Sequence, residues 1–317
     1  MRKWMIIFLF IILTMMLSSC QTYTITYTDD DPFVLEMKGD SLKILQLTDL
    51  HLTFGYDQRD RRTFRLIEAL NDQDDYDLIV ITGDMTMSPS APELFRKLIT
   101  FMETLKTPWT FIFGNHETDY HTYEDFIRVI PDDTTYLYFK VGPKLEEGGI
   151  GNFHFTITKN DLPVYRLYML DSKAERDEYT EEEGEYDYLS TAQVNWFKDH
   201  AELDSVRNLV FMHIPLRQYI DAVDYDGFFL EDKVYAQGVD TGFFDAMVDT
   251  AKTTAVFVGH DHLNDFIFAK DSIFLVYGRA TGFNGYGTLE KGGRHIEVYP
   301  DSSAIRTFVM WESVVLS

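Results

Sequence analysis

From residue 41 onward, continuous apolar stretches alternate with segments whose apolar residues recur at helical spacing. Strands are expected at LKILQL (42–47), in DLIVITGD (77–84) and in WTFIFGNHE (109–117), and helices at 59–70, 92–105 and near 123–129. Strands that alternate with helices imply crossover connections and a mainly parallel sheet. These strands are apolar throughout, which indicates burial on both faces of the sheet.

The second half of the chain adds antiparallel features. Residues 152–172 predict a hairpin, and helices are expected at 191–201 and 243–251. Further strands are expected in NLVFMHIP (208–215), in TAVFVGHDH (254–262) and in three candidates running to Val315. The pattern predicts a layered α/β sandwich with antiparallel additions.

The first 20 residues have the pattern of an export signal. Arg2 and Lys3 precede an apolar run over residues 4–17, and the stretch ends in LSSC (17–20). As a helix this run would be about 21 Å long, short of the ~30 Å hydrocarbon core, so a permanent membrane span is the weaker interpretation. The ending resembles the lipobox of bacterial lipoproteins, which implies cleavage before Cys20 and lipid attachment to its sulfur. This resemblance predicts an extracytoplasmic protein, lipid-anchored to the bacterial cell membrane.

After the signal, residues 21–40 are expected to form a tether with a candidate edge strand, and residues 41–317 one domain. Cys20 is the single cysteine of the chain, so the exported domain can form no internal disulfide. Its stability would depend on the apolar core and on bound metals. The sequence leaves the oligomeric state open.

The chain is strongly acidic, with a formal net charge of −24. Such a charge repels nucleic-acid backbones and anionic lipid surfaces on average, so no nucleic-acid polymer is expected as a partner. A small phosphate ester stays compatible with the charge, because a local site that holds metal ions can be cationic.

Metal-ligating residue types follow five predicted strands at the point where each strand ends. In open α/β sheets the carboxyl ends of the strands share one edge, where ligands bind. Side chains at positions i and i+2 leave an extended segment on the same side, so each such pair can reach one site. The residues at these exits are Asp49, His51, Gly83-Asp84, Gly114-Asn115-His116-Glu117, His213 and Gly259-His260-Asp261-His262.

Taken singly, an Asp or His at a strand end is more often a helix cap or a turn residue than a ligand. The coincidence favours a common site, because five of the nine histidines lie at these exits. The other four histidines are expected to be surface or structural groups: His121, His154, His200 and His295. For His121, an outer-shell role beside the metals stays open.

In this order, the motifs D-x-H, G-D, G-N-H-[DE], a histidine after a strand and G-H-x-H resemble those of the calcineurin-like metallophosphoesterases. The resemblance covers residues 41–262 and implies a four-layer α/β/β/α metallophosphoesterase sandwich with mixed sheets. It also implies two divalent metal ions and a catalytic histidine, His116, that binds neither. One ion would be held by Asp49, His51, Asp84 and His262, and the other by Asp84, Asn115, His213 and His260.

Elementary chemistry agrees with a dinuclear centre. Two divalent ions about 3.5–4 Å apart repel each other and need a shared carboxylate, for which Asp84 is the central candidate. Imidazole, carboxylate and amide ligands suit Zn, Mn or Fe, whereas a structural zinc site built from cysteines is disfavoured. We expect a metal-activated hydroxide to attack phosphorus while His116 protonates the leaving oxygen. Glu117 is expected to orient the His116 ring.

Further segments resemble a narrower branch of this superfamily, related to purple acid phosphatases and called Dcr2-like. They are KILQLTDLH (43–51), YMLDS (168–172), STAQVNWFK (190–198), HIPLRQY (213–219) and YGRATGFNGYG (277–287). The chain departs from true purple acid phosphatases at Met87, where that family has a metal-binding tyrosine. The departure implies that the tyrosinate-to-iron charge-transfer colour of that family is not expected here.

Substrate choice is expected to depend on loops above the metals. Arg217 and Arg279 are candidates for gripping phosphate, because a guanidinium matches a phosphoryl edge, although a structural ion pair fits both equally well. The segment 171–187 carries nine acidic residues and is expected to be a solvated loop, which would repel polyanions if it lies near the site.

Three functions are compatible with these features. The first is hydrolysis of phosphate monoesters at the outer face of the cell membrane. The second is a phosphodiesterase acting on cyclic nucleotides or glycerophosphodiesters. The third is a non-catalytic, metal-binding surface lipoprotein, which is weakened because every ligand of the motif set is present. Metal identity and physiological substrate stay open.

Overall fold

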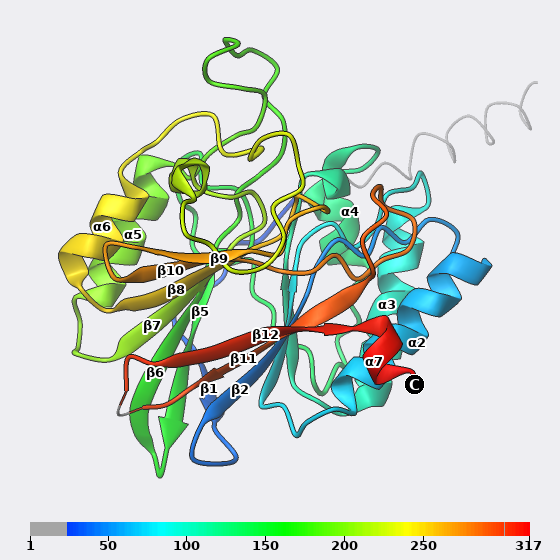
Figure 1. Ribbon diagram of the computed structural model, residues 1–317, viewed down its shortest axis with the longest axis horizontal. Helices are drawn as coiled ribbons and strands as arrows, with labels where there is room; N and C mark the ends of the chain where they lie inside the picture. The colour runs from blue at the N-terminus through cyan, green and yellow to red at the C-terminus, as the bar shows by residue number, and fades with distance from the viewer. Residues whose placement is uncertain (1–23, 301) are drawn as a thin grey trace, which may run out of the picture.

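The computed structural model describes residues 24–300 and 302–317 and shows two β-sheets packed face to face with helices outside both (Figure 1). The helices are α2 (Gln58–Asn71), α3 (Ala91–Leu105), α4 (Tyr123–Arg128), α5 (Thr191–Ala201), α6 (Phe243–Thr250) and α7 (Glu312–Val315), with 3-10 turns at His116–Thr118 and Arg217–Asp221. The strands are β1 (Phe33–Glu36), β2 (Leu42–Leu47), β3 (Leu78–Thr82), β4 (Trp109–Ile112), β5 (Phe153–Lys159), β6 (Leu162–Met169), β7 (Arg207–Phe211), β8 (Thr253–Val258), β9 (Ile267–Lys270), β10 (Ile273–Tyr277), β11 (Gly292–Val298) and β12 (Ile305–Trp311). Within the described ranges, the helices are all too short or too polar to cross a membrane.

The smaller sheet has five strands in the order β12-β11-β2-β3-β4. Strands β2, β3 and β4 are parallel, with Leu47 opposite Ile81 and Ile81 opposite Phe111. Helices α2 and α3 are the crossovers between them, as the alternation of strands and helices requires. Strand β11 is antiparallel to both β2 and β12.

The larger sheet has seven strands in the order β1-β5-β6-β7-β8-β10-β9. Its centre, from β6 to β10, is parallel, and the β5–β6 hairpin is antiparallel with an irregularity at Ile157 and Thr158. Strand β1 pairs parallel with β5 at one edge, and β9 pairs antiparallel with β10 at the other.

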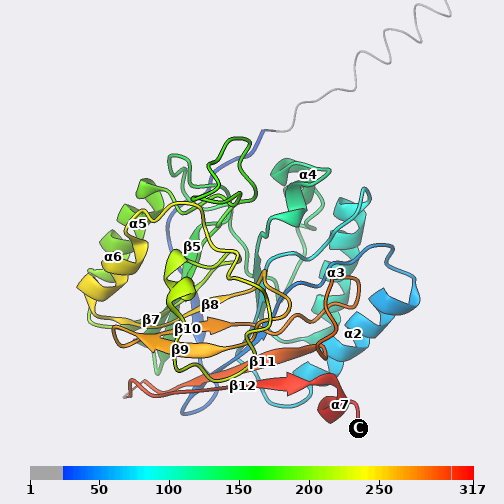
Figure 2. The same ribbon diagram turned by 45° about the horizontal axis from the view of Figure 1, so that its top comes forward.

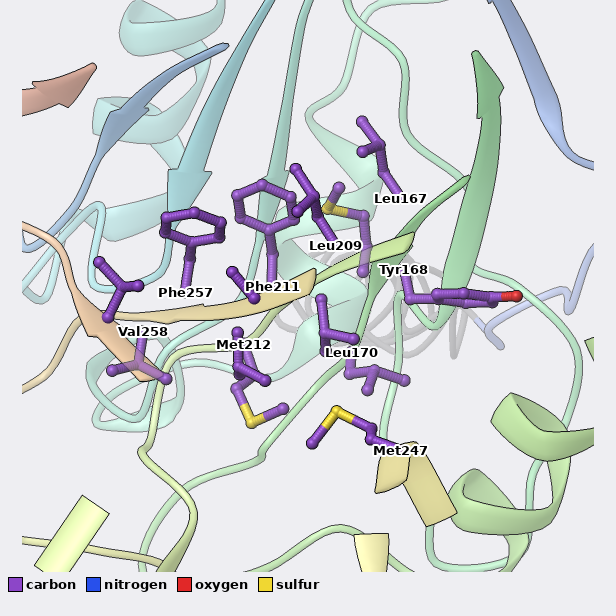
Figure 3. Packing of buried hydrophobic residues seen from close by; sticks show 14 of the residues in the cluster. Leu167, Tyr168, Leu170, Leu209, Phe211, Met212, Met247, Phe257 and Val258 are labelled. Carbon is purple, nitrogen blue, oxygen red and sulfur yellow. The ribbon is translucent and has the colours of Figure 1, made fainter. Parts of the chain in front are cut away.

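Apolar side chains fill the space on both faces of the larger sheet (Figure 3). Phe211 of β7 and Phe257 of β8 stack on one face with ring centroids 5.1 Å apart, and Met212 lies on the opposite side, toward Met247 of α6. All four are buried, and burial stabilises each such side chain by about 1.5–3 kcal/mol. Two-sided burial explains why these strands lack a polar alternation.

The helices begin where the sequence supplies caps. At α5, Ser190 and Gln193 form a capping box, and at α2 the Asp57 side chain accepts from the N–H of Asp60. Helix α3 ends at Lys106, which has a left-handed φ of 59°. Figure 2 shows α2 and α3 outside the smaller sheet and α5 and α6 outside the larger one, which completes the four layers.

The predicted four-layer α/β/β/α class with mixed sheets is confirmed. The parallel strands are divided between the two sheets, with β2, β3 and β4 in the smaller one and β6, β7, β8 and β10 in the larger one. One detail is corrected: residues Glu312–Val315 form a helix in place of a strand. Part of the expected tether belongs to the fold, since β1 is an edge strand. The expected signal at 1–20 and Cys20 lie outside the described residues.

Candidate metal centre

The five ligand-bearing strand exits meet where the two sheets adjoin. Strands β2, β3 and β4 bring their ends from the smaller sheet, and β7 and β8 bring theirs from the larger one. Gln46 Nε2 donates to Val258 O at 3.0 Å, and His213 Nδ1 lies 2.7 Å from Thr82 O, so the sheets are bonded to each other here. All seven predicted metal ligands are buried at this junction: Asp49, His51, Asp84, Asn115, His213, His260 and His262.

One group consists of Asp49, His51 and His262, whose ligand atoms lie within 4.8 Å of one another. His51 Nε2 is 2.9 Å from His262 Nε2, which in turn is 3.4 Å from Asp49 Oδ1. His262 Nδ1 lies 3.1 Å from Tyr286 O. Because a carbonyl oxygen only accepts, Nδ1 carries the proton, and Nε2 keeps its lone pair for a metal ion.

A second group consists of Asp84, His213 and His260. His213 Nε2 lies 3.2 Å from Asp84 Oδ2. Asn115 Oδ1 joins this group, 3.0 Å from both His213 Nε2 and His260 Nδ1. Asp84 Oδ2 also lies 3.6 Å from His51 Nε2, so this carboxylate stands between the two groups.

The backbone at these exits takes an unusual conformation. Asp49, His51, Asp84 and His260 have φ angles of 54°, 45°, 52° and 79°, in the left-handed region that costs free energy for residues other than glycine. Before Asp84, Gly83 has φ +86°, and a Cβ there would come within 2.5 Å of His213 Nδ1. Such strain is retained where a side chain has to be aimed.

The buried histidines of the junction differ in the direction of their pKa shifts. Burial lowers the pKa of His51 and of His260 to about 3, so both rings are neutral. Burial also opposes the charged form of His213, but Asp84 outweighs it and raises that pKa to about 10. Burial raises and the histidines lower the pKa of Asp84, with a net value well below the usual range. Burial raises and His262 lowers the pKa of Asp49, with a net value below the usual range, so two ionised carboxylates are buried beside a protonated His213.

These residues fit a pair of divalent ions. Buried carboxylates need compensating positive charge, which divalent ions would supply to Asp49 and Asp84 in place of a protonated His213. His51 Nδ1 is buried without a hydrogen-bond partner, and its Nε2 faces another imidazole nitrogen. Imidazole, carboxylate and amide oxygen suit Zn, Mn or Fe. The two groups match the two ligand sets that the motif resemblance implies, with Asp84 shared.

Two glutamates outside the ligand groups hold the ligands in place. Glu117 is buried and accepts from the N–H groups of Asp84, Thr86 and Gly114 at 3.0, 3.0 and 2.7 Å, which binds the β3 exit to the β4 exit. Burial raises the pKa of Glu117 to about 7. Glu175 Oε1 accepts from Asn115 Nδ2 at 2.9 Å, so the amide oxygen of Asn115 is the atom that faces the site.

His116 lies at the mouth of the centre with its own hydrogen-bond partner. Its Nδ1 is 2.9 Å from Asp119 Oδ2, and its ring centroid is 5.2 Å from that of His51. The expectation that Glu117 orients the His116 ring is wrong, because the Glu117 carboxylate is bonded to backbone N–H groups and Asp119 takes that position. Burial lowers the pKa of His116, but Asp84 and Asp119 outweigh it and the net shift is upward.

A cavity of about 510 Å³ opens above the ligands. Tyr286 stacks on His262 with centroids 4.1 Å apart, and Tyr186 meets His260 edge-on at 4.3 Å. Within the described part of the chain, neither lysine nor arginine lines this cavity. The lining residues are His51, Asp84, Met87, His116, Tyr186, Glu231, Tyr235, His260, Asp261, His262, Asn284, Gly285 and Tyr286.

The two arginines expected to grip phosphate lie outside this cavity, which corrects the expectation. Arg217 Nη1 donates to the carbonyl of Gly238 at 3.0 Å, beside the acidic segment. Arg279 is fully buried, donates to the carbonyl of His262 and has its Nη1 3.5 Å from Asp265 Oδ2. Arg279 therefore positions the backbone of a ligand and does not face a substrate.

Sequence reasoning missed Asp119, Glu175 and the tyrosines of the cavity wall. Asp119 had a usable signal, since it lies three residues after His116, within one helical turn. Glu175 and Tyr186 come from the acidic segment 171–187, which folds back on itself through a bridge between these two residues. Their sequence distance from every ligand left no signal.

The order and spatial grouping of these residues match a known family. The model of the family described as Calcineurin-like phosphoesterase matches residues 42–264, which contain every proposed ligand. The chain belongs to the calcineurin-like phosphoesterase family. The metal-binding hydrolase class that the motifs predicted is thereby supported.

Relatives of this calcineurin-like phosphoesterase agree with the narrower resemblance. The chain is 25% identical over 293 residues to an Arabidopsis thaliana protein named "Probable inactive purple acid phosphatase 14", covering 78% of this chain and 72% of that protein. It is 26% identical over 277 residues to "Phosphatase DCR2" of Saccharomyces cerevisiae, covering 74% of this chain and 47% of the yeast protein. The chain thus spans about half the length of the yeast relative.

A solved structure shares the fold. A dimetal phosphatase from Danio rerio superposes with a TM-score of 0.57 at 12% sequence identity, over 84% of this chain and 98% of that one. At this identity the likeness shows the architecture alone.

Proposed function

We propose that this protein hydrolyses phosphate monoesters at a dinuclear divalent metal centre. The observation that carries the proposal is the position of Asp84, whose Oδ2 lies 3.6 Å from His51 Nε2 in one group and 3.2 Å from His213 Nε2 in the other. When bound, a pair of such ions supplies Lewis-acid charge neutralisation and lowers the pKa of a water molecule. The family match supports this chemistry, and the zebrafish protein that shares the fold is named a dimetal phosphatase.

The residues of the chain have separate tasks in this proposal. The ligand groups bind and space the ions, with Asp84 shared. Asp119 holds His116 Nδ1, so Nε2 is the nitrogen that donates a proton to the leaving oxygen. The tyrosines and Met87 around the cavity receive an apolar or aromatic leaving group and exclude water from it.

A second candidate function, phosphodiester hydrolysis, is favoured by the charge of the cavity wall. Glu231 and Asp261 line the cavity, whereas among the described residues no lysine or arginine does. A diester carries a single negative charge and needs less compensation than the dianion of a monoester. For monoesters and diesters alike, a small substrate whose organic group is uncharged suits this acidic wall.

The experiment compares turnover of p-nitrophenyl phosphate and bis(p-nitrophenyl) phosphate by metal-reconstituted protein, with Asp84→Asn as the inactive control. Faster hydrolysis of the monoester supports the proposal, and faster hydrolysis of the diester replaces it with the second candidate. Absence of activity on a broad ester panel by protein that holds two ions overturns both in favour of a non-catalytic metal protein. The broad ester panel is needed because the Arabidopsis relative is named a probable inactive phosphatase.

We also propose that the enzyme acts outside the cytoplasm, attached to the cell membrane through lipidated Cys20. The LSSC ending of the apolar N-terminal run supports this location. In membrane fractionation, the wild-type protein is expected in the membrane pellet and Cys20→Ala in a different fraction or with its signal uncleaved. Identical fractionation and processing of the two would contradict lipid anchoring.

A further inference from the structure

A second cluster of metal-ligating side chains lies on the face of the larger sheet that α5 covers. A carboxylate oxygen of Asp30 and one ring nitrogen each of His154 and His200 lie within 4.8 Å of one another. His154 belongs to β5 and His200 to the last turn of α5, while Asp30 belongs to the segment 24–32 that precedes β1. The cluster shares no residue with the described lining of the catalytic cavity.

Carbonyl oxygens occupy one nitrogen of each histidine ring and leave the other nitrogen available for a ligand role. His200 Nδ1 lies 2.8 Å from Trp196 O, and His154 Nε2 lies 3.1 Å from Asp30 O. Because carbonyl oxygens only accept, both of these nitrogens carry protons. The lone pair of the His154 ring is then on Nδ1, and His200 Nε2, which faces Asp30 Oδ2 at 3.1 Å, has a lone pair for a metal ion when the ring is neutral. Metal-ligating histidines are oriented in this way, with the second nitrogen bonded to a carbonyl or carboxylate.

The free nitrogen of His154 is buried without a partner. His154 is only 2% exposed, and its Nδ1 makes no hydrogen bond within the described structure. The ring stacks on Tyr168, and its centroid is 4.6 Å from that of His200. Burial, together with His200, lowers the pKa of His154 to about 4, so the ring is neutral. An unsatisfied buried acceptor costs about 1–3 kcal/mol, which a bound cation would offset.

Asp30 supplies negative charge and access from solvent. Its Oδ2 lies 3.1 Å from His200 Nε2, and its Oδ1 accepts from Trp196 Nε1 at 2.8 Å. The side chain of Asp30 is 39% exposed, so an ion can enter from that side. The neighbouring cations are already paired, Lys140 with Asp29 and Arg166 with Asp204.

We propose that Asp30, His154 and His200 bind one divalent cation of the zinc class, separate from the dinuclear centre. Two imidazoles and one carboxylate, with water as the fourth ligand, form a zinc ligand set. The ion adds to the contacts that already join the segment 24–32 to the domain, which include Thr28 N to Gly142 O at 3.0 Å, Trp196 Nε1 to Asp30 Oδ1 at 2.8 Å and the Lys140–Asp29 ion pair. It therefore fastens the N-terminal segment to the domain. The sequence-based expectation that His154 and His200 are ordinary structural groups is replaced by this role.

The competing interpretation is an ion pair between an imidazolium at His200 and Asp30, which holds the segment without metal. The two interpretations differ in zinc stoichiometry. Full-length protein is stripped of metal, reloaded with Zn²⁺, passed over a chelating resin and analysed for zinc per chain. The variants are Asp30→Ala and His200→Ala, and the matched control is His121→Ala, whose ring bonds Pro89 O.

The proposal expects Asp30→Ala and His200→Ala each to bind one zinc fewer per chain than the wild-type protein and the His121→Ala control. Equal zinc in all four overturns it, whatever the occupancy of the dinuclear centre. Hydrogen exchange of the wild-type protein gives a second reading that needs no variant. Exchange over residues 24–32 is expected to slow at least several-fold when zinc is added, and exchange that zinc leaves unchanged overturns the proposal.

Discussion

At the scale of single residues, the ligands of the centre are aimed by the atoms that do not face it. Asp84 Oδ1 accepts the backbone N–H of His116 at 3.0 Å, which leaves Oδ2 to face His213. Asn115 Nδ2 donates to Glu175, which turns its amide oxygen inward. His116 differs, because its ring is bonded to Asp119 and is partly exposed. Binding and proton transfer can therefore be separated by mutation.

Replacing His116 by alanine is expected to slow turnover by about 10²–10⁴ while metal content stays near that of the wild-type protein, the usual share of a general acid. The measurement pairs kcat on a nitrophenyl ester with metal analysis of the same sample. Asp119→Asn, which keeps a partner for the ring, should lose less activity. Loss of one or both ions in His116→Ala would instead make His116 a ligand.

Replacing Glu175 by alanine is expected to weaken binding of the ion held by Asn115, His213 and His260 by about 10–100-fold, because the amide loses the acceptor that orients it. The ion at Asp49 and His51 should keep its affinity. Stepwise metal titration separates the two ions, and Glu178→Ala, an exposed change in the same acidic segment, is the control. Equal affinities in all three proteins would remove this role from Glu175.

At the scale of elements, β6 is followed by a carboxylate, as the ligand-bearing strands are, but this carboxylate binds backbone N–H groups. Asp171 follows β6, and its carboxylate accepts from the N–H groups of Ile150 and Lys173, both at 2.8 Å. The next residue, Ser172, accepts from the N–H of Ile214, beside the β7 exit. Burial raises the pKa of Asp171 to about 6, although these hydrogen bonds lower it. A carboxylate at a strand exit is thus no proof of a metal ligand.

The raised pKa of Asp171 predicts a pH dependence of stability. The unfolded chain ionises this group at a pKa near 3.8 and the folded chain near 6, so its ionisation increasingly favours the unfolded state as pH rises through that window. Relative to Asp171→Asn, the free energy of unfolding of the wild-type protein should fall by roughly 2 kcal/mol between pH 4 and pH 7. Denaturant melts across this range measure the difference, and a constant difference would contradict the shift.

At the scale of the whole molecule, the centre is a junction between two sheets. The smaller sheet brings Asp49, His51, Asp84 and Asn115, and the larger sheet brings His213, His260 and His262. The group of Asp49, His51 and His262 and the group of Asp84, His213 and His260 each contain residues from both sheets. Metal binding should therefore stabilise the packing of one sheet on the other in addition to supplying chemistry.

Removal of metal is expected to lower the melting temperature. An ion present at about 100 times its Kd stabilises the folded state by about 2.7 kcal/mol, which corresponds to roughly 5–10 °C for a domain of this size. Thermal unfolding with and without a chelator measures the shift, and readdition of zinc should restore it. A melting temperature that is insensitive to chelator and metal alike would show that the sheets pack independently of the centre.

Much of the fold and of the ligand set could be predicted because both depend on local patterns. Apolar runs and helix caps are short-range features, so β2 and α5 were predicted with the bounds that the structure has. The ligands could be found because parallel strands bring their carboxyl ends together, which turns a recurring position in the sequence into a place in space. Arg217 and Arg279 were chosen from guanidinium chemistry alone, and their contacts with the carbonyls of Gly238 and His262 follow from no sequence pattern.

The sequence by itself determined the element order, the ligand types and their places at the strand exits, since these follow from periodicity and residue chemistry. Only the tertiary structure decided which strands form each of the two sheets, that Asp119 and Glu175 aim His116 and Asn115, and that Asp30 meets His154 and His200. These contacts join residues up to 170 positions apart. They depend on how whole layers pack. That packing is determined by burial of apolar surface over the entire chain, so no single segment of the sequence reveals it.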